Sequence, residues 1–267
     1  SGSIAVFAFV VILWKLEGEW LSKAEGKYDL VGAILYSLGL VSFMYGLSSF
    51  SNDDRAIFFF FAGLVMLGIF AFYETRIKYP LLDLKLFANN ITFSFSNLAA
   101  FINYAATFAV TFLLSIYLQE VRGYDSQMAG FILLAQPVMM ALLSPLAGSL
   151  SDRKEPRIVA SIGMGLSAFS LFLFLFLGAE TSIILVMANL LIIGVGFALF
   201  SSPNTNAVMG SVSKEIYGVA SSTLGTARLV GQAISMAIVT LLISLFIGNI
   251  ELHQASPDVI VKLTKTA

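Results

Sequence analysis

Apolar residues in this sequence form long runs that alternate with short polar segments. A helix needs about 20 apolar residues to cross the hydrocarbon core of a bilayer, and several runs reach this length. Backbone groups in hydrocarbon must pair within their own segment, and the runs lack the two-residue alternation of barrel strands, so each run predicts a transmembrane helix. The predicted full spans are 29–50, 56–74, 91–118, 127–148, 156–178, 182–208 and 219–248.

The two ends of the chain follow a different pattern. Residues 3–14 are apolar but too short to cross a bilayer, which predicts the end of a further span. Residues 249–267 are too polar for a span and are expected to form a tail. The chain begins Ser-Gly-Ser without Met, so we expect a fragment or a trimmed protein. The predicted fold class is an all-α polytopic membrane helix bundle, with about seven full transmembrane helices plus one partial.

Composition narrows the class further. With 58% hydrophobic residues, 12% charged residues and a mean hydropathy of +0.90, the chain is far from the composition of a soluble domain. The absence of cysteine excludes disulfides and thiolate metal sites. A net charge of −1 without a basic block predicts no nucleic-acid partner, so the expected surroundings are the lipid bilayer.

Lys and Arg residues are distributed unevenly between alternate short loops. One side holds ten of them, whereas the other side holds Arg55 and Arg122. The ten are Lys15, Lys23, Lys27, Arg76, Lys78, Lys85, Arg153, Lys154, Arg157 and Lys214. Because basic residues favour the cytoplasmic side, the loop with Asp152 is predicted to be cytoplasmic in a multi-pass protein of the cell (plasma) membrane.

A short charged turn joins spans 127–148 and 156–178. It carries a Gly, an Asp and two Arg residues at fixed spacing, namely Gly148, Asp152, Arg153 and Arg157. This pattern resembles the loop signature of the major facilitator superfamily of secondary transporters, although Glu155 and Pro156 replace a Gly and a basic residue. The resemblance implies a loop that switches conformation during transport. Asp152 is expected to cap the next helix or to pair with a cation in one access state, and Pro156 suits a first helical position.

Other segments resemble the fourteen-helix drug:proton antiporter branch of this superfamily. They are the Pro80–Phe87 run, Lys27–Gly32, Gln119 with Gly123 and Gly130, Pro203-Asn204, and Gly218–Ser222 with Arg228 and Gly231.

The resemblance implies the following organisation. Residues 1–27 are the end of a preceding helix and a cytoplasmic linker, and residues 28–75 are two extra helices between the transporter halves. Residues 76–90 are a cytoplasmic interfacial segment. Residues 91–248 are five helices of the carboxyl-terminal half, and residues 249–267 are a polar tail. The amino-terminal half and the last helix are then missing from this chain.

The same resemblance implies proton-coupled efflux of a small-molecule substrate, a hydrophobic or cationic drug-like compound, by alternating access against the missing amino-terminal half. No membrane-embedded carboxylate is evident, so the proton carrier is expected in that half, or coupling is not to protons. The alternative function is a seven-helix receptor or scaffold without transport. Short loops and the many Gly, Pro and Asn residues in the spans argue against this alternative.

Polar residues in span 91–118 gather within an arc of roughly 120° at about 100° per residue. They are Asn97, Asn103, Tyr104, Thr107 and Thr111. Because polar groups facing lipid are costly, this arc is expected either to line a transport cavity or to supply hydrogen bonds between helices.

Three further spans carry transport-path candidates. Gln136, before Pro137, is expected either to satisfy the carbonyl that the proline frees or to face a substrate. Asn204 and Asn206 follow Pro203 in span 182–208, where Gly194 and Gly196 predict close helix packing. Span 219–248 presents a polar face of Ser221, Arg228, Gln232 and Ser235. Arg228 is expected to pair with carbonyls, Asp152 or the missing half, or to snorkel to lipid headgroups.

Nothing in the sequence indicates an enzyme. The single His, His253, lies in the predicted tail without metal partners, and no span holds a pair of acidic residues for acid–base catalysis. A phosphate-binding Gly-rich loop with Lys is absent, so ATP is not the expected energy source. No catalytic residue, metal site or cofactor is predicted.

Overall fold

The computed structural model describes residues 29–49, 55–77, 80–82, 85–246 and 256–266. Within these ranges the regular structure is helical, and strands do not occur. Seven segments are long and apolar enough to cross a membrane: Leu30–Leu47, Ala56–Glu74, Ile91–Val121, Ser126–Arg153, Pro156–Phe174, Ile183–Gly210 and Lys214–Phe246. The predicted all-α membrane bundle with seven full spans is therefore confirmed, while the predicted partial span at 3–14 lies outside the described residues.

The helices follow one another through short connections. They are α2 (Leu30–Ser48), α3 (Ala56–Glu74), α4 (Lys85–Asn89), α5 (Ile91–Ile116), α6 (Ser126–Leu133), α7 (Ala135–Arg153), α8 (Pro156–Phe174), α9 (Ile183–Gly210), α10 (Tyr217–Phe246) and α11 (Pro257–Thr266). A π-helical turn, η1 (Tyr117–Val121), extends α5, and a 3₁₀ turn, η2 (Lys214–Ile216), precedes α10.

Span 127–148 differs most from its predicted form. It consists of α6 and α7, which are separated at Leu134. Pro137 has no N–H to donate to the carbonyl of Leu133, and the helix is interrupted next to that carbonyl. At its other end α7 continues through Asp152 to Arg153, five residues past the predicted boundary. The charged turn is therefore shorter than predicted.

Within the predicted polar tail, residues Pro257–Thr266 form a short helix, α11, which is not among the candidate spans. Ile260, Val261 and Leu263 are buried, and they lie on one side of a helix whose other residues are mostly polar. Val261 packs with Tyr117 and Leu118 of η1, and Leu263 packs with Leu113 of α5. This segment is too polar to span a membrane, but its three buried apolar residues allow a short helix to pack on the bundle.

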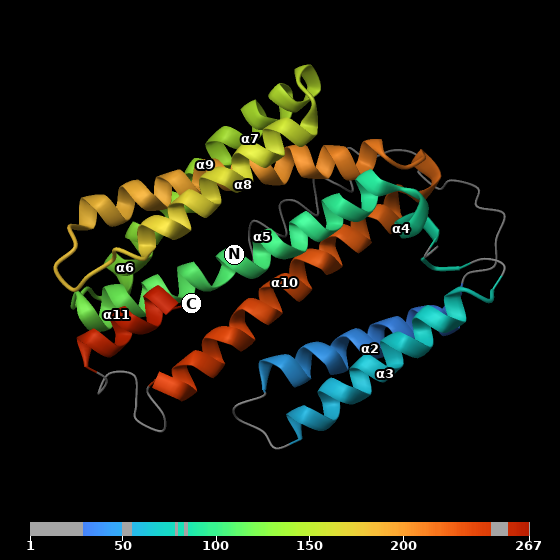
Figure 1. Cartoon of the computed structure of the whole chain (residues 1–267), viewed down its shortest axis with the longest axis horizontal. Coiled ribbons are helices and arrows are strands. Elements are labelled where there is room, and N and C mark those ends of the chain that lie inside the picture. Colours follow the sequence, from blue (N-terminus) through green and yellow to red (C-terminus); the bar gives the residue numbers. More distant parts are fainter. Residues whose placement is uncertain (1–28, 50–54, 78–79, 83–84, 247–255, 267) are drawn as a thin grey trace, which may run out of the picture.

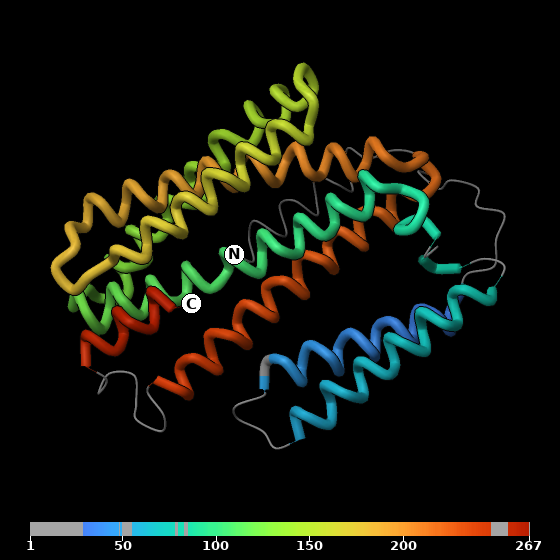
Figure 2. The backbone as a smooth tube through the Cα atoms, in the orientation of Figure 1, coloured from blue at the N-terminus to red at the C-terminus, as the bar shows by residue number. Residues whose placement is uncertain are grey.

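α9 packs against α5, α7, α8 and α10. Half of the residues in its apolar window are buried, which is the largest share among the seven candidate spans. α7 and α8 pack against it on one side, and α5 pairs with α10 (Figures 1 and 2). The α2–α3 hairpin lies beyond α10, where the Tyr36 hydroxyl is 2.5 Å from Oγ1 of Thr226.

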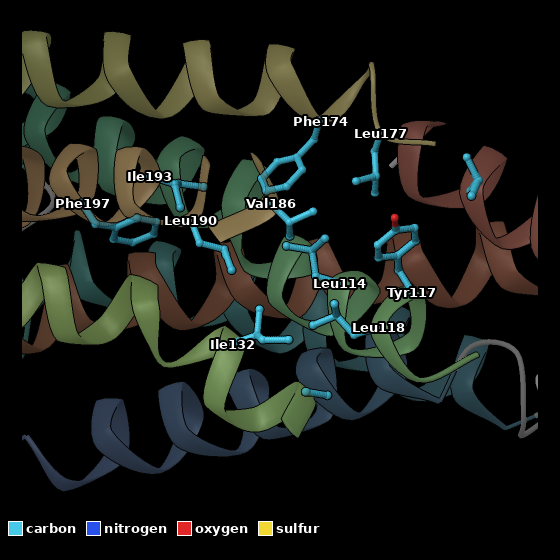
Figure 3. Close-up of a cluster of buried hydrophobic side chains, with 12 residues drawn as sticks. Leu114, Tyr117, Leu118, Ile132, Phe174, Leu177, Val186, Leu190, Ile193 and Phe197 are labelled. Carbon is cyan, nitrogen blue, oxygen red and sulfur yellow. The ribbon is translucent and has the colours of Figure 1, made fainter. Parts of the chain in front are cut away.

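Large aliphatic and aromatic side chains fill the bundle where α5, α6, α8 and α9 converge (Figure 3). Leu190 and Ile193 of α9 are fully buried between Phe174 of α8 and Leu114 of α5. The Tyr117 hydroxyl is satisfied in this apolar cluster, because it donates to the Gly178 carbonyl at 2.8 Å. Many apolar side chains on the outer surface are exposed, for example Phe58 and Phe72, as a lipid-facing surface requires.

Glycine allows α8 and α9 to approach closely. A β-carbon on Gly196 would lie 2.6 Å from Oγ of Ser167 and 2.9 Å from the Gly163 carbonyl. A β-carbon on Gly163 would meet the backbone of Phe200 at 2.5 Å. The close packing predicted at Gly194 and Gly196 is thus confirmed, and Gly194 makes the corresponding contact with Gln136 of α7.

Candidate functional site

The most notable polar contact in the bundle centres on Arg228 of α10. Its guanidinium donates to Oγ1 of Thr205 on α9 at 2.7 Å, and Cζ lies 5.7 Å from the centre of the Tyr104 ring on α5. The Tyr104 ring packs edge-on against Phe197 of α9. One half-buried cation therefore joins three helices, and we refer to Arg228, Thr205 and Tyr104 as the Arg228 node.

The Arg228 node favours the interior placement of this arginine over snorkelling. Its partners are a hydroxyl and an aromatic ring instead of the expected backbone carbonyls or Asp152. Nε of Arg228 is buried and has no hydrogen-bond partner, and no carboxylate of the described residues pairs with the guanidinium. Gln232, one turn further along α10, is half-buried. The site therefore holds a cation with unused donor capacity.

The polar arc of α5 divides into two groups. Asn97, Asn103 and Thr107 are buried, and their hydrogen bonds involve α5 itself: Asn97 Nδ2 donates to the Phe93 carbonyl, and Thr107 Oγ1 donates to the Asn103 carbonyl. These three residues therefore do not line an open cavity within the described bundle. Oδ1 of Asn97 and Nδ2 of Asn103 remain without partners. Tyr104 belongs to the Arg228 node, and Thr111 is exposed.

Thr111 and Gln136 form a separate contact between α5 and α7. Oγ1 of Thr111 donates to Oε1 of Gln136 at 3.4 Å. The oxygen of the Gln136 side chain is thus turned toward α5. Only the amide Nε2 could donate to the freed carbonyl, so this contact does not decide between the two alternatives. The backbone of Gln136 also contacts Gly194 of α9, so this residue sits where three helices meet.

Asn204 and Asn206 flank Thr205 of the Arg228 node, but their side chains bond to other partners. Nδ2 of Asn204 donates to the Ser96 carbonyl of α5 at 3.1 Å, and Nδ2 of Asn206 donates to Oγ of Ser151 on α7 at 2.8 Å. Both residues line a groove of about 780 Å³ between α5, α8 and α9, together with Arg157. The two asparagines therefore fasten α9 to α5 and α7, at the end of the bundle that holds the charged turn.

The charged turn does not have the predicted capping geometry. Asp152 is exposed and belongs to the last turn of α7, and the N-cap of α8 is Glu155, which makes no side-chain capping bond. The expectation that Asp152 caps α8 is wrong in this structure, because two residues separate it from the N-cap. Pro156 does occupy the first turn of α8, as expected. Arg157 pairs with Glu155 at 3.2 Å on the surface.

The other residues of the loop signature lie nearby. Gly148 contacts Oγ of Ser202 on α9 at a distance of 3.1 Å from its would-be β-carbon, and Arg153 is exposed at the end of α7. Sequence reasoning missed Ser151 and Thr205, which hold Asn206 and Arg228. Both are small hydroxyl residues that are common in membrane helices, so only their position next to Asp152 and within the Asn-Thr-Asn run could have drawn attention to them.

Comparison with known proteins identifies related sequences over most of the chain. The sequence profile of the Major Facilitator Superfamily matches residues 97–248. The riboflavin transporter RibZ of Clostridioides difficile (strain 630) is 28% identical over 236 residues, covering 88% of this chain and 50% of that protein. The multidrug resistance protein Stp of Mycobacterium tuberculosis (strain ATCC 25618 / H37Rv) is 26% identical, covering 87% and 44%. The lincomycin resistance protein LmrB of Listeria innocua is 25% identical, covering 82% and 47%. The chain spans about half the length of these relatives.

Proposed function

Because this chain belongs to the Major Facilitator Superfamily, we propose that it is the carboxyl-terminal portion of a secondary transporter that exports drug-like compounds by proton-coupled alternating access. The Arg228 node carries this proposal. A cation within an apolar span costs free energy, about 2.5–3.5 kcal/mol at a helix centre on insertion scales, and such residues usually serve substrate or ion pathways. Relatives that are named as multidrug and lincomycin resistance proteins support export over uptake.

The charge of the node bears on the substrate. A second cation beside the Arg228 guanidinium would be repelled in a low-dielectric site, whereas a neutral aromatic compound can stack near the Tyr104 ring and accept a hydrogen bond. We therefore favour hydrophobic neutral compounds over the cationic ones that the family resemblance also allows. A cationic substrate would need a carboxylate from the missing half to offset Arg228.

The proposed pathway lies between this chain and an amino-terminal half that it lacks. In this arrangement Tyr104, Thr205, Arg228 and Gln232 contact the substrate. Asn97, Asn103, Thr107, Asn204 and Asn206 act in helix packing, since their described partners are backbone or hydroxyl groups of the bundle. Thr111 and Gln136 are proposed to stand at the edge of the path, because Thr111 is exposed.

The proposed setting follows the distribution of basic residues. In this proposal the protein lies in the plasma membrane, and its loop with Asp152 is on the cytoplasmic side. Residues 28–75 form two extra helices between the transporter halves, and residues 91–248 form five helices of the carboxyl-terminal half. The position of the α2–α3 hairpin on the outer side of α10 supports a peripheral role for 28–75. The alternative of a receptor or scaffold without transport finds no support in the names of the relatives.

The proposal is tested with the full-length protein, comprising this chain and the amino-terminal half, in inverted membrane vesicles. A neutral and a cationic lipophilic fluorophore are compared, each with and without a protonophore. We expect saturable accumulation of the neutral fluorophore that the protonophore abolishes. Accumulation that survives the protonophore would contradict proton coupling, and a preference for the cationic fluorophore would contradict the proposed selection of neutral compounds.

A further inference from the structure

Two carboxyl groups that the transport proposal does not use meet at one end of the α2–α3 hairpin. Asp29 is the N-cap of α2, and its Oδ1 accepts a hydrogen bond from the Gly32 amide at 2.9 Å. Glu74 is the last residue of α3 and is only 4% exposed. The two residues come from different helices and are 45 positions apart in the sequence, so no local pattern announces their contact.

Gly32 shows how close the two carboxyl groups are. A β-carbon on this glycine would collide with Oδ2 of Asp29 and with Oε1 of Glu74, the latter at 2.6 Å. Both oxygens therefore lie within 2.6 Å of one point beside Gly32. Both are buried, and neither has a hydrogen-bond partner in the described part of the protein. The glycine provides the space that this contact requires.

Among the described residues, the remaining neighbours of the pair carry no compensating positive charge. Oε2 of Glu74 accepts a hydrogen bond from the Leu82 amide at 3.0 Å, and the Tyr73 hydroxyl lies 3.5 Å from Oδ1 of Asp29. The guanidinium of Arg76 packs over the Phe72 ring, 5.1 Å from its centre. α10 contacts α2 through Thr226, which does not titrate. Among the described residues, no Lys, Arg or His forms an ion pair with either carboxyl group.

Every other described acidic residue is exposed: Glu120, Asp125, Asp152, Glu155, Glu180, Glu215 and Asp258. Two ionised carboxylates whose buried oxygens lie this close repel each other strongly, and each would leave one oxygen unsatisfied. A single proton removes both penalties, because one group becomes a carboxylic acid that donates to the carboxylate of the other.

We propose that Asp29 and Glu74 form a proton-binding site, in which one proton is shared between Oδ2 of Asp29 and Oε1 of Glu74. The pair then carries a charge of −1 and joins the start of α2, the end of α3 and, through Leu82, the segment that leads to α4 and α5. Loss of the proton leaves two facing negative charges and weakens this junction. The site is independent of the transport proposal, and it places one bound proton in this chain.

The test uses infrared spectroscopy of the full 267-residue chain in lipid nanodiscs at pH 7, where free carboxyl groups are ionised. We expect a C=O stretching band of one protonated carboxyl group, which shifts on deuteration and is absent in both Glu74→Gln and Asp29→Asn. Asp125→Asn is the matched control, since Asp125 caps α6 through Met128 N at 2.9 Å but is exposed and has no facing carboxyl group. This control should keep the band.

Absence of the band in the unaltered chain at pH 7 would overturn the proposal, whatever the variants do. Persistence of the band in either variant would overturn it as well, because a single carboxyl group would then be protonated without its partner. A second measurement follows the melting temperature with pH. Above about pH 5 the folded state holds a proton that the unfolded state has lost, so unfolding becomes more favourable, by up to about tenfold per pH unit, as pH rises. Glu74→Gln should abolish this dependence, and equal slopes in both proteins would contradict the site.

Discussion

At the scale of single residues, Arg228 shows how charge and shape make separate contributions. A lysine at this position would keep the positive charge but lose the planar fork that donates to Thr205 while it packs against the Tyr104 ring. A hydrogen bond from a charged donor contributes about 1.5–3 kcal/mol, so its loss is large on the scale of substrate binding.

We therefore predict that Arg228→Lys lowers the transport rate of the full-length protein by roughly tenfold, which corresponds to about 1.4 kcal/mol. The rate is measured in inverted vesicles at matched expression. The control is Arg76→Lys, because the Arg76 guanidinium also packs over an aromatic ring, that of Phe72 at 5.1 Å, but is exposed beyond the end of α3. Equal rates for Arg228→Lys and the unaltered protein would show that charge alone matters at this site.

For Asp152 we make a different prediction, because this residue does not cap α8 in the structure. The residue is exposed at the end of α7, so Asp152→Asn should change stability by no more than about 0.5 kcal/mol. If Asp152 pairs with a cation in another access state, the same substitution should slow transport while expression and melting temperature stay normal. Transport at the rate of the unaltered protein would leave no switching role for Asp152.

At the scale of helices, the glycines of α8 offer a matched pair of sites. A β-carbon on Gly163 would meet the backbone of α9, whereas a β-carbon on Gly165 would meet nothing within 4 Å. Valine at either position imposes the same β-branched side chain on the same helix. Backbone atoms cannot move aside as a flexible side chain can, so only the first substitution should separate α8 from α9.

Gly163→Val is accordingly predicted to destabilise the chain by about 1–3 kcal/mol or more, and Gly165→Val by less than about 0.5 kcal/mol. Melting temperatures of the two variants in one detergent provide the comparison. A similar loss in both variants would mean that the cost arises from the helix itself and not from the contact between α8 and α9.

The elements also show what apolar patterning can and cannot predict. The lengths of the apolar runs predicted the seven spans, because a backbone in lipid must satisfy its hydrogen bonds within a helix. The break before Pro137 and the burial of α11 needed information about neighbours: α11 has few apolar residues, and its helix depends on contacts with α5 and η1. Pairs such as Ser170 with Asn189, which exchange hydrogen bonds between α8 and α9, are invisible without knowing which helices touch.

At the scale of the whole molecule, the site could be predicted only in part. Periodicity placed Tyr104 and Arg228 on polar faces of their own helices, but it could not reveal that these faces meet through Thr205 of a third helix. It likewise could not separate Asn97 and Asn103, which are buried within the packing, from residues that are open to a pathway. The Asp29–Glu74 contact was missed for the same reason, since it joins two helix ends.

The chain spans about half the length of its relatives, and this bears on what it can do alone. Alternating access moves two transporter halves against each other around a substrate near the bilayer midplane. Under the function proposed above, the residues of the Arg228 node form only one side of such a path in the isolated chain. We therefore predict that the 267-residue chain, reconstituted in lipid vesicles, inserts and folds but shows no saturable, gradient-dependent uptake of a lipophilic fluorophore.

The measurement compares these vesicles with vesicles that contain the full-length protein, at equal protein density and with the same imposed proton gradient. Helical content by circular dichroism serves as the folding control, so that a lack of uptake is not mistaken for a lack of structure. Co-reconstitution with the separately expressed amino-terminal half should restore uptake, because the two walls of the path can then assemble. Robust saturable uptake by the chain alone would contradict the half-transporter interpretation, and it would require a complete pathway within the seven spans.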